Sequence, residues 1–357
     1  MDQEYTERLS KIEKELERWL PKNQEAALNT PWAEQVFTCA GKKAGLEAIK
    51  ALTDPLNDML SRGGKRWRPL LMTLVCETLG GGNAAIPLTP AVEFAHNASL
   101  IHDDIEDDSA ERRGQPAIHK IYGLDTAVNS ASFFYFLSTC CIENAADTPN
   151  IKEQIYKFWM EYMRRLHLGQ AMDINWHRNI SVIPEIEEYF LMCRMKTGSL
   201  ARLAAELGAY IARTPANKTT PQKAIQMIGE AADMMGVGFQ ILDDVKNLTT
   251  GIPGKRKGDD FVEGKKSLPI LLYLKKYPEM HNKILYCFHV AKREGTRAPE
   301  VEELIGNMTA AGVFIEAEEK AVSLLGEMQK AVCSDEISHL INENSRSLLA
   351  GFIKLIS

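Results

Sequence analysis

Apolar side chains recur at spacings of three and four residues along most of this 357-residue chain. In residues 3–20, charged side chains separate an apolar series made of Tyr5, Leu9, Ile12, Leu16 and Leu20. This is the period of amphipathic α-helices, and we find no alternating β-branched run bounded by hairpin turns. The pattern therefore predicts an all-α fold without strands. Helices are expected over residues 3–20, 44–60, 66–79, 90–107, 124–146, 151–175, 183–213, 221–249, 266–276, 297–312, 314–332 and 335–356.

The breaks between these helices are short. Glycine and proline interrupt the pattern at several points, such as Gly80-Gly81-Gly82 and Pro269, but none of these breaks is long enough for an interdomain linker. Length alone, at roughly 150 residues per domain, would favour two domains. Because no linker is found, we expect a single domain over residues 1–357, in which residues 1–40 form an N-terminal helical flank.

Composition excludes several protein classes. Hydrophobic residues make up 45% and charged residues 25% of the chain, which is typical of a globular protein rather than a disordered or fibrous one. The net charge of −6 argues against a nucleic-acid partner. The 7 cysteines form no CxxC pair, so neither a disulfide framework nor a structural zinc site is expected. The charged N-terminus lacks the apolar segment of a secretory signal, and no stretch reaches about 20 apolar residues, so we expect a cytoplasmic protein without a membrane span.

Three expected helices are apolar on nearly every side. They contain the segments Val92–Ile101, Ser199–Ile211 and Met234–Leu242, which are rich in alanine, serine and glycine. Such helices lie at the centre of a large bundle. Their small residues are compatible either with close helix packing or with an apolar cavity, and periodicity alone does not separate the two.

Two acidic clusters each close one of these apolar helices. In the first, Asp103 and Asp107 are four residues apart and share a helix face, with Asp104 beside them. In the second, Asp243 and Asp244 end the segment GFQILDD. Such carboxylates repel one another unless a cation binds, and they suit Mg²⁺, which takes one or two carboxylates together with substrate phosphates. Two such clusters facing one cavity would bind a diphosphate through several Mg²⁺ ions.

Basic residues form a complementary set. Arg112 and Arg113 follow the first acidic cluster, and paired guanidinium groups suit diphosphate oxygens. Further basic residues lie in the segments GGKRWRP (63–69), MKTGS (195–199) and GKRKGDDFVEGKKS (254–267). Anion binding through Mg²⁺ and anion binding by basic groups imply two diphosphate sites. Together with apolar helices that suit a hydrocarbon tail, this arrangement predicts the joining of two prenyl diphosphates.

The motifs and their order resemble those of the trans-isoprenyl diphosphate synthases, also called polyprenyl synthases. The resemblance runs from about Gly63 to Pro269 and includes GGKRWRP, SLIHDDIEDDSAERRGQPAIH, GQAMDI, MKTGSL, GFQILDDVKN and KGDDFVEGKKSLP. DDIEDDS, HKIYG, LGQAMDINW and DDVKN are most similar to the eukaryotic-type geranylgeranyl diphosphate synthases. The family implies the isoprenoid synthase fold, a helical bundle around a deep central apolar cavity, usually as a homodimer.

The resemblance implies a role for each matching residue. It implies a catalytic set of Asp103, Asp104, Asp107, Lys196, Thr197, Gln240 and Asp243, and metal binding by Asp103, Asp107, Asp243 and Asp244. It implies an allylic diphosphate site made of Arg112, Lys196, Lys257 and Lys265, and an isopentenyl diphosphate site made of Lys65, Arg68, His96 and Arg113. Three Mg²⁺ ions per site are expected, with Mn²⁺ as an alternative ion.

Two features depart from the common family pattern. Asn247 stands where many members have a third aspartate of the second motif, although the eukaryotic-type enzymes also carry asparagine there. Lys255 and Lys257 both lie near the position of the single family lysine, and of the two we favour Lys257.

The residues before the first motif bear on product length. Ala98 and Ser99 lie one turn before Asp103, followed by Ala95 and then Phe94. Because no bulky residue occupies the first turn, the product should grow past C15. The aromatic run Phe133–Phe136 would form the floor of the cavity or belong to ordinary core.

We therefore expect a prenyltransferase that condenses isopentenyl diphosphate head-to-tail with allylic diphosphates, giving all-trans geranylgeranyl diphosphate (C20). Three alternatives stay open at this point: a longer product of C25 or more, a class I terpene cyclase, and a non-catalytic partner subunit.

Overall fold

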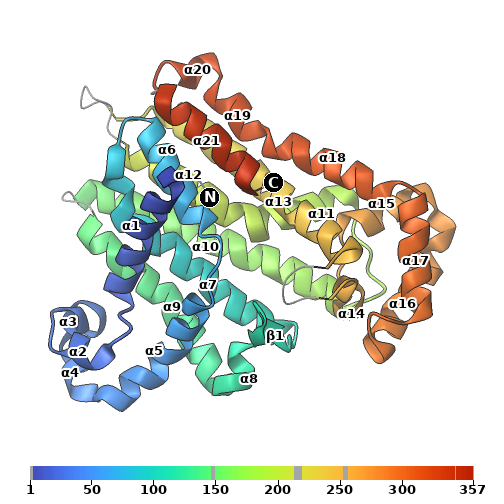
Figure 1. Ribbon diagram of the computed structural model, residues 1–357, viewed down its shortest axis with the longest axis horizontal. Coiled ribbons are helices and arrows are strands. Elements are labelled where there is room, and N and C mark those ends of the chain that lie inside the picture. The colour runs from blue at the N-terminus through green and yellow to red at the C-terminus, as the bar shows by residue number, and fades with distance from the viewer. Residues whose placement is uncertain (1–2, 146–148, 213–218, 252–255, 342, 357) are drawn as a thin grey trace. The chain divides into compact units, whose positions relative to one another are not determined.

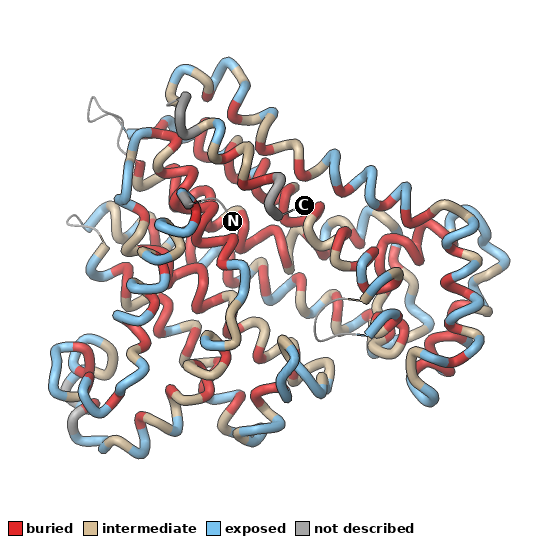
Figure 2. Tube along the Cα trace, viewed as in Figure 1, coloured by how far each residue is buried: buried red, intermediate tan, exposed pale blue. Residues whose placement is uncertain are grey.

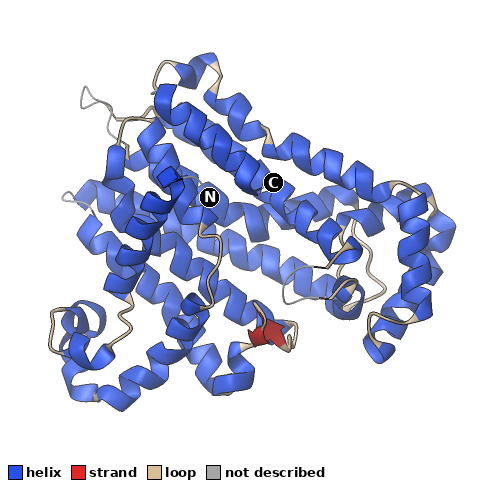
Figure 3. Cartoon of the chain, in the orientation of Figure 1, coloured by secondary structure: helices blue, strands red, loops and turns tan. Residues whose placement is uncertain are grey.

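The structure is a computed structural model that describes residues 3–145, 149–212, 219–251, 256–341 and 343–356. Helices account for nearly all of its regular structure (Figure 3), so the all-α prediction is confirmed. None of the helices in the described ranges is both long and apolar enough to cross a membrane.

The chain divides into two compact units. The first unit consists of Met1–Glu161, Leu203–Gln226 and Asp335–Leu349, and the second of Tyr162–Arg202, Met227–Ser334 and Ala350–Ser357. Four long helices continue from one unit to the other: α10 (Pro149–Arg178), α12 (Ser199–Ile211), α13 (Gln222–Thr249) and α21 (Glu343–Ile356). The expectation of a single domain stays a prediction, since this division describes only how the chain packs.

The first unit contains most of the N-terminal elements (Figure 1). They are α1 (Gln3–Trp19), α2 (Gln24–Leu28), α3 (Trp32–Phe37), α4 (Gly41–Ala44), α5 (Leu46–Ser61), α6 (Trp67–Thr78), α7 (Thr89–Glu106), α8 (Ile118–Tyr122) and α9 (Leu124–Ala145), joined later in the chain by α20 (Asp335–Ser338). Short 3₁₀ turns occupy Thr38–Ala40 and Gly82–Leu88.

The core of the first unit lies between α7 and α9. The rings of Phe94 and Phe134 stack with centroids 4.7 Å apart, and neither side chain is exposed. Buried and exposed residues alternate along the helices (Figure 2). Helix α1 buries Ile12 and Leu16 while each of its described charged residues is at least partly exposed, which confirms the amphipathic N-terminal helix. Burial of this stripe, at about 25 cal/mol per Å² of apolar surface, stabilises the attachment of α1.

A two-residue hairpin corrects the expectation of no strands. Strand β1 (Glu111–Arg112) pairs antiparallel with β2 (Gln115–Pro116). The two residues that join them, Arg113 and Gly114, have φ angles of 55° and 74°. A two-residue hairpin of this kind needs positive φ at both central positions. The strands were missed because two residues are too few to show an alternating pattern.

The second unit contains the remaining elements. They are α11 (Ile186–Cys193), a π-helical turn (Arg194–Gly198), α14 (Asp259–Glu263), α15 (Leu268–Lys276), a 3₁₀ turn (Pro278–Met280), α16 (His281–Glu294), α17 (Pro299–Ala310), α18 (Val313–Leu325) and α19 (Glu327–Val332). The expected helix over 221–249 is confirmed as α13, whereas the expected helix over 183–213 is interrupted by the π-helical turn.

Helix α16 was not predicted. Its buried residues Ile284, Cys287, Phe288 and Ala291 do follow the helical spacing. Polar residues at 281–283 and 292–294 flank these positions, which leaves an apolar run too short for the helical spacing to stand out.

Candidate active site

The first acidic cluster lies at the C-terminal end of α7. Asp107 is the C-cap, and its backbone N–H donates to the carbonyl oxygen of Asp103 at 2.9 Å. The last turn carries no basic residue. Carboxylates are unfavourable at this end, because the helix dipole places partial negative charge there. Asp103 and Asp107 are half-buried, so the local structure favours a cation beside them.

Arg112 lies against this cluster because the hairpin turns the chain back. Its Nε donates to the two carboxylate oxygens of Asp104 at 2.8 and 3.1 Å, and its Nη2 lies 3.4 Å from Asp103 Oδ2. Asp104 has no exposed surface. A buried carboxylate paired bidentately with a guanidinium is strongly held. The structure therefore brings Asp103, Asp104 and Arg112 together, with Asp104 bonded to the arginine.

In the same unit, arginine side chains surround His96. The Nη1 of Arg68 lies 3.3 Å from His96 Nε2, and the Arg68 guanidinium lies 4.3 Å from the Trp67 ring centroid. Burial and the positive charges of Arg68 and Arg113 hold the pKa of His96 well below its usual value of 6.5. The imidazole is therefore neutral at pH 7, and the positive charge around it comes from the arginine side chains.

Arg113 lies under the glycine turn of the GGKRWRP segment. Its Nη1 donates to the carbonyl oxygens of Gly63 and Met59, the latter at 3.3 Å. A Cβ on Gly64 would lie 2.9 Å from Arg113 Nη2, so only glycine allows this approach without displacing the guanidinium. Burial lowers the pKa of Arg113 to about 10. Lys65, two residues after Gly63, is exposed.

Arg66 anchors this segment from within. It has a left-handed backbone with φ of 47°, and its side chain is 4% exposed. The guanidinium donates to Glu13 at 2.8 Å, to Glu93 at 2.9 Å and to the carbonyl oxygen of Leu60 at 2.8 Å. From the sequence, Arg66 was only one of the basic residues of the GGKRWRP segment, without a predicted role. The structure places it in an internal ion-pair network that reaches α1.

The second acidic cluster lies on α13, in the second unit. Asp243 is half-buried, whereas Asp244 is 8% exposed. The hydroxyl of Tyr189 donates to Asp244 Oδ2 at 2.6 Å, and the side-chain amide of Gln240 donates to Asp244 Oδ1 at 2.9 Å. Burial raises the pKa of Asp244 to about 6, against the effect of these two hydrogen bonds.

The π-helical turn presents Lys196 and Thr197 in the same unit. The Thr197 hydroxyl donates to Gln240 Oε1 at 2.8 Å, and Lys196 Nζ lies 2.6 Å from Asp173 Oδ2. A π-bulge inside a helix often marks a functional position. Asp173 was missed as a partner of Lys196, although it lies in the GQAMDI motif of the sequence analysis.

Buried charge fixes the start of this turn. The carboxylate of Asp233 is fully buried, and its Oδ2 lies 3.3 Å from Arg165, 3.1 Å from Arg194 and 3.7 Å from Arg202. These residues come from α13, α10, the π-helical turn and α12. This single carboxylate therefore connects the turn that carries Lys196 and Thr197 to α10, α12 and α13.

The structure describes only some of the lysines in the glycine-rich segment of residues 254–267. Lys257 is exposed, and Lys265 Nζ lies 2.8 Å from Glu263 Oε2. Lys255 lies outside the described residues. The choice between Lys255 and Lys257 therefore stays a prediction.

Magnesium fits the donors of both acidic clusters. Within the described ranges, no group of three or more His, Cys, Asp or Glu side chains is gathered closely enough to hold a metal ion. Each cluster instead offers one or two carboxylates, which is how Mg²⁺ binds when substrate phosphates and water complete its coordination.

The residues expected to control product length lie along α7. Ala95 and Ala98 have no exposed surface, and the half-buried Ser99 donates its hydroxyl to the carbonyl oxygen of His96 at 2.7 Å. Phe94 points to α9, where it stacks on Phe134. The rest of the aromatic run is mixed, since Phe136 is 69% exposed.

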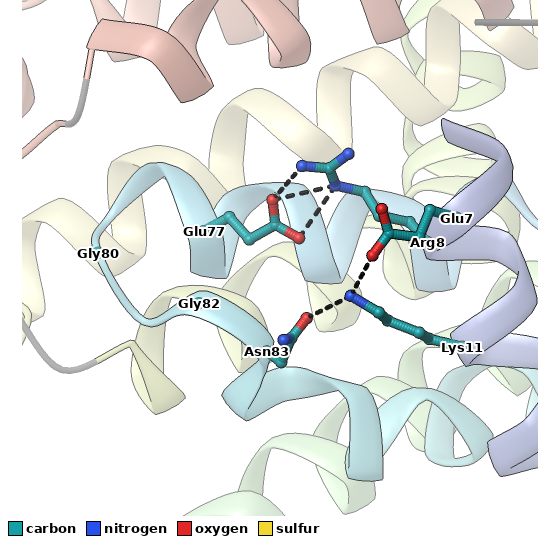
Figure 4. Close-up of a pocket in the computed structure, with 7 residues that line it drawn as sticks. All are labelled: Glu7, Arg8, Lys11, Glu77, Gly80, Gly82 and Asn83. Carbon is teal, nitrogen blue, oxygen red and sulfur yellow. Dashed lines mark hydrogen bonds and ion pairs between the residues drawn. The ribbon is translucent and has the colours of Figure 1, made fainter. Parts of the chain in front are cut away.

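A pocket of about 370 Å³ lies apart from all of these residues, beside α1 in the first unit (Figure 4). In it, Arg8 pairs with Glu77 at 2.6 Å, and Lys11 pairs with Glu7 at 2.8 Å. Lys11 also donates to Asn83 at 3.5 Å. Because these opposite charges pair with one another, the pocket is a contact between α1 and the end of α6.

Comparison with known proteins gives a consistent result. The sequence model of the polyprenyl synthetase family matches residues 49–308. The geranylgeranyl pyrophosphate synthase of Eremothecium gossypii is 34% identical over 245 residues, which cover 67% of this chain and 74% of the relative. That of Neocamarosporium betae is 31% identical over 290 residues, covering 80% and 79%.

A further curated relative and a solved structure are also similar to this chain. The geranylfarnesyl diphosphate synthase of Aeropyrum pernix is 34% identical over 226 residues, covering 61% of this chain and 69% of the relative. The crystal structure of geranylgeranyl pyrophosphate synthetase from Pyrococcus horikoshii Ot3 covers 99% of this chain and 96% of its own, with a TM-score of 0.76 and 25% identity. With the family model matching well over half of its length, the chain belongs to the polyprenyl synthetase family of trans-prenyltransferases.

Proposed function

We propose that this prenyltransferase makes geranylgeranyl diphosphate (C20) from isopentenyl diphosphate and allylic diphosphates. The observation that carries the proposal is the cationic group around His96. Four arginines, Arg66, Arg68, Arg112 and Arg113, all lower the pKa of that histidine through their charge. Carboxylates pair with Arg66 and Arg112, so Arg68 and Arg113 are the cations beside His96 that favour a diphosphate.

The isopentenyl diphosphate site is proposed to consist of Lys65, Arg68, His96 and Arg113. Arg68 contacts His96, and Arg113 lies against Gly64 in the segment that carries Lys65. The neutral imidazole donates one hydrogen bond to a diphosphate oxygen, while the guanidinium groups and the ammonium group balance its charge.

Asp103 and Asp107 are proposed to bind Mg²⁺ in the first unit, and Asp243, with Asp244 in support, in the second. The number of ions expected is three. When bound, Mg²⁺ supplies Lewis-acid neutralisation of the departing diphosphate. Asp104 orients Arg112 through the paired hydrogen bonds described above.

The diphosphate of the allylic substrate is proposed to bind Arg112, Lys196, Lys257 and Lys265. Their positive charge stabilises the diphosphate as the C–O bond breaks. Thr197 and Gln240 present oxygen atoms that stabilise positive charge on the allylic carbon. The double bond of isopentenyl diphosphate then attacks this carbon, and the proton that is lost passes to the departing diphosphate.

The C20 length is proposed from α7. Ala95, Ala98 and Ser99 leave the first turns without bulk, and the stacked rings of Phe94 and Phe134 supply bulk further along. The curated relatives named as geranylgeranyl pyrophosphate synthases favour the same length. A C25 product is the second candidate, since one relative is named as a geranylfarnesyl diphosphate synthase.

A homodimer is proposed from the exposed face of α9. Leu124, Val128 and Phe136 are 57%, 40% and 69% exposed and are spaced by four and eight residues, so they form one apolar stripe. The family resemblance makes a second copy of this chain the expected occupant. Phe136→Glu should yield a monomer by analytical ultracentrifugation, and an unchanged mass would contradict the assignment. The cytoplasmic location stays a prediction.

Two aspartate substitutions test the function. Asp103→Asn and Asp243→Asn should each lower turnover by about 100-fold or more, because each removes charge that holds the metal. Circular dichroism should show intact helices. Asp108→Asn is the matched control, since Asp108 belongs to the same acidic run but is exposed and paired with Lys120. Equal losses in all three variants would contradict the proposal.

A further inference from the structure

The segment of residues 256–266, here called the lysine segment, is held at both ends by buried polar side chains. It contains α14, Lys257 and Lys265. On one side it meets α13 at Asn247, and on the other it meets the end of α10 at Lys266. Neither Asn247 nor Lys266 has a role in the proposed chemistry.

Asn247 holds the start of α14. Its side-chain oxygen accepts a hydrogen bond from the backbone N–H of Asp260 at 3.1 Å, and its backbone oxygen accepts one from Gly258 at 2.9 Å. Asn247 is 2% exposed. Two of the backbone N–H groups at the start of α14 are therefore satisfied by one residue of α13, which fixes the segment to that helix.

The chemistry of this contact favours an amide over a carboxylate. Asn247 lies four residues after Asp243, on the same face of α13. A carboxylate at this buried position would add repulsion towards Asp243 and Asp244 and a desolvation cost, whereas an amide oxygen accepts the hydrogen bond from the backbone N–H of Asp260 without charge. This explains the asparagine in the second motif without making it a metal ligand.

Lys266 holds the other end. It is 3% exposed, and its Nζ donates to the carbonyl oxygen of Trp176 at 2.5 Å and to that of Gly264 at 2.7 Å. Trp176 lies in the last turn of α10, where carbonyl oxygens have no partner within the helix. The ammonium group also lies 4.9 Å from the Phe288 ring centroid. A cation at a helix C-terminus is favourable, so Lys266 ties the segment to α10.

Between these anchors the chain has little freedom. The backbone N–H of Lys265 donates to the carbonyl oxygen of Asp260 at 2.8 Å. Phe261 is fully buried against Phe288, with ring centroids 5.5 Å apart. The position of Lys265 therefore follows from the position of α14, which Asn247 and Lys266 set.

We propose that Asn247 and Lys266 are positioning residues that hold the lysine segment so that Lys265 is in place before the allylic diphosphate binds. The inference rests on the proposed function, because it assigns Lys265 to that diphosphate. Neither residue contacts the substrate in this account. Their effect is to spare the enzyme the cost of ordering the segment on binding.

Four variants of the full-length enzyme test the proposal, with two measurements on each. The first is amide hydrogen exchange of peptides within residues 256–266, read without substrate. The second is steady-state kinetics in Mg²⁺, with separate KM values for the allylic starter and for isopentenyl diphosphate. Asn247→Leu is close in size and removes the acceptor, whereas Asn247→Asp keeps it. Lys266→Met removes the two donated bonds, and Lys265→Met removes the proposed diphosphate contact itself.

The expected pattern separates anchoring from direct binding. Asn247→Leu and Lys266→Met should each speed exchange in the segment about tenfold and raise the allylic KM by a similar factor, as expected for one or two lost hydrogen bonds. The KM for isopentenyl diphosphate should not change. Asn247→Asp, which keeps the acceptor, should exchange more slowly than Asn247→Leu. Lys265→Met should raise the allylic KM while exchange stays slow.

Other outcomes would overturn the proposal. Slow exchange with an unchanged allylic KM in both Asn247→Leu and Lys266→Met would refute anchoring. A raised Mg²⁺ requirement in Asn247→Leu, with exchange still slow, would make Asn247 a metal ligand instead. Absence of turnover in the wild type would contradict the proposed function, and the exchange data would still decide whether the two residues hold the segment.

Discussion

The hydroxyl of Thr197 donates a hydrogen bond to the side-chain carbonyl oxygen of Gln240, with 2.8 Å between the two oxygens. The amide nitrogen of Gln240 in turn donates to Asp244 at 2.9 Å. The amide orientation of Gln240 is therefore fixed from both sides, and the second acidic motif is connected to the π-helical turn that carries Lys196.

Removing this connection should slow the reaction. Gln240→Leu takes away the acceptor of Thr197 and one donor to Asp244, so we expect turnover to fall about 10- to 100-fold, equivalent to roughly 1.5–3 kcal/mol for a hydrogen bond to a charged group. Thr197→Val removes only the first bond and should cost less. Steady-state kinetics measures both. A larger loss in Thr197→Val than in Gln240→Leu would contradict the ordering.

A glycine on α10 allows the π-helical turn to approach. A Cβ on Gly169 would lie 2.3 Å from the backbone nitrogen of Lys196. Gly169→Ala should therefore destabilise the fold by about 1–3 kcal/mol, as overpacking does, and should also lower turnover. Gly306 on α17 is the matched control, since nothing lies within 4 Å of an added Cβ there.

Gly306→Ala should instead raise stability by about 0.5–1 kcal/mol, because alanine is the better helix former. Chemical denaturation compares the two variants. Equal destabilisation would show that the close approach at Gly169 is unimportant.

Arg66 and Glu13 should differ sharply in their effect on stability. Arg66→Met leaves Glu93, which is 2% exposed, as a buried carboxylate without its guanidinium partner, and breaking such a pair costs about 3–5 kcal/mol. Glu13→Gln affects a carboxylate that is 53% exposed, so its cost should stay below about 1 kcal/mol. Denaturant titration of both variants checks this. Similar losses of stability in the two variants would mean that Glu13 on α1 contributes as much to the network as Glu93 on α7.

The stability of the protein should depend on His96 below pH 7. Burial and neighbouring arginines lower the pKa of His96 in the folded state, so the unfolded chain takes up a proton near pH 6.5 when the folded chain does not. Stability should therefore decrease as pH falls below about 6.5, by about 1.4 kcal/mol per pH unit. His96→Gln should lack this contribution, which is the difference between the two stability curves from pH 7 to pH 5. Parallel curves would contradict a lowered pKa.

Residue periodicity was enough to predict most helices, because α1, α7 and α13 each bury one continuous apolar series. Features that depend on a few residues were missed. The β1–β2 hairpin depends on the backbone of Arg113 and Gly114, and the π-helical turn depends on how Gly169 allows α10 to approach. Neither leaves a periodic pattern in the sequence.

The motif residues were predicted, but their partners were not. Spacing placed Asp103 and Asp107 on one face, and the pattern of basic residues pointed to Arg112. The bonds of Asp173 to Lys196 and of Tyr189 to Asp244 join positions that are far apart in the chain. Such pairings follow from tertiary packing, and Asn247 gave no sign in the sequence that it holds the backbone of Asp260.

The central claim, that this chain elongates prenyl diphosphates to C20, is tested most directly by a product-length assay. Purified protein is incubated with Mg²⁺, labelled isopentenyl diphosphate and a C5, C10 or C15 allylic starter, and the dephosphorylated products are sized by chromatography. We predict a dominant C20 product from all three starters. A ladder reaching C30 or beyond would contradict the C20 assignment. Release of diphosphate and hydrocarbon without elongation, as in a terpene cyclase, or no turnover in a folded protein, as in a partner subunit, would contradict the claim as a whole.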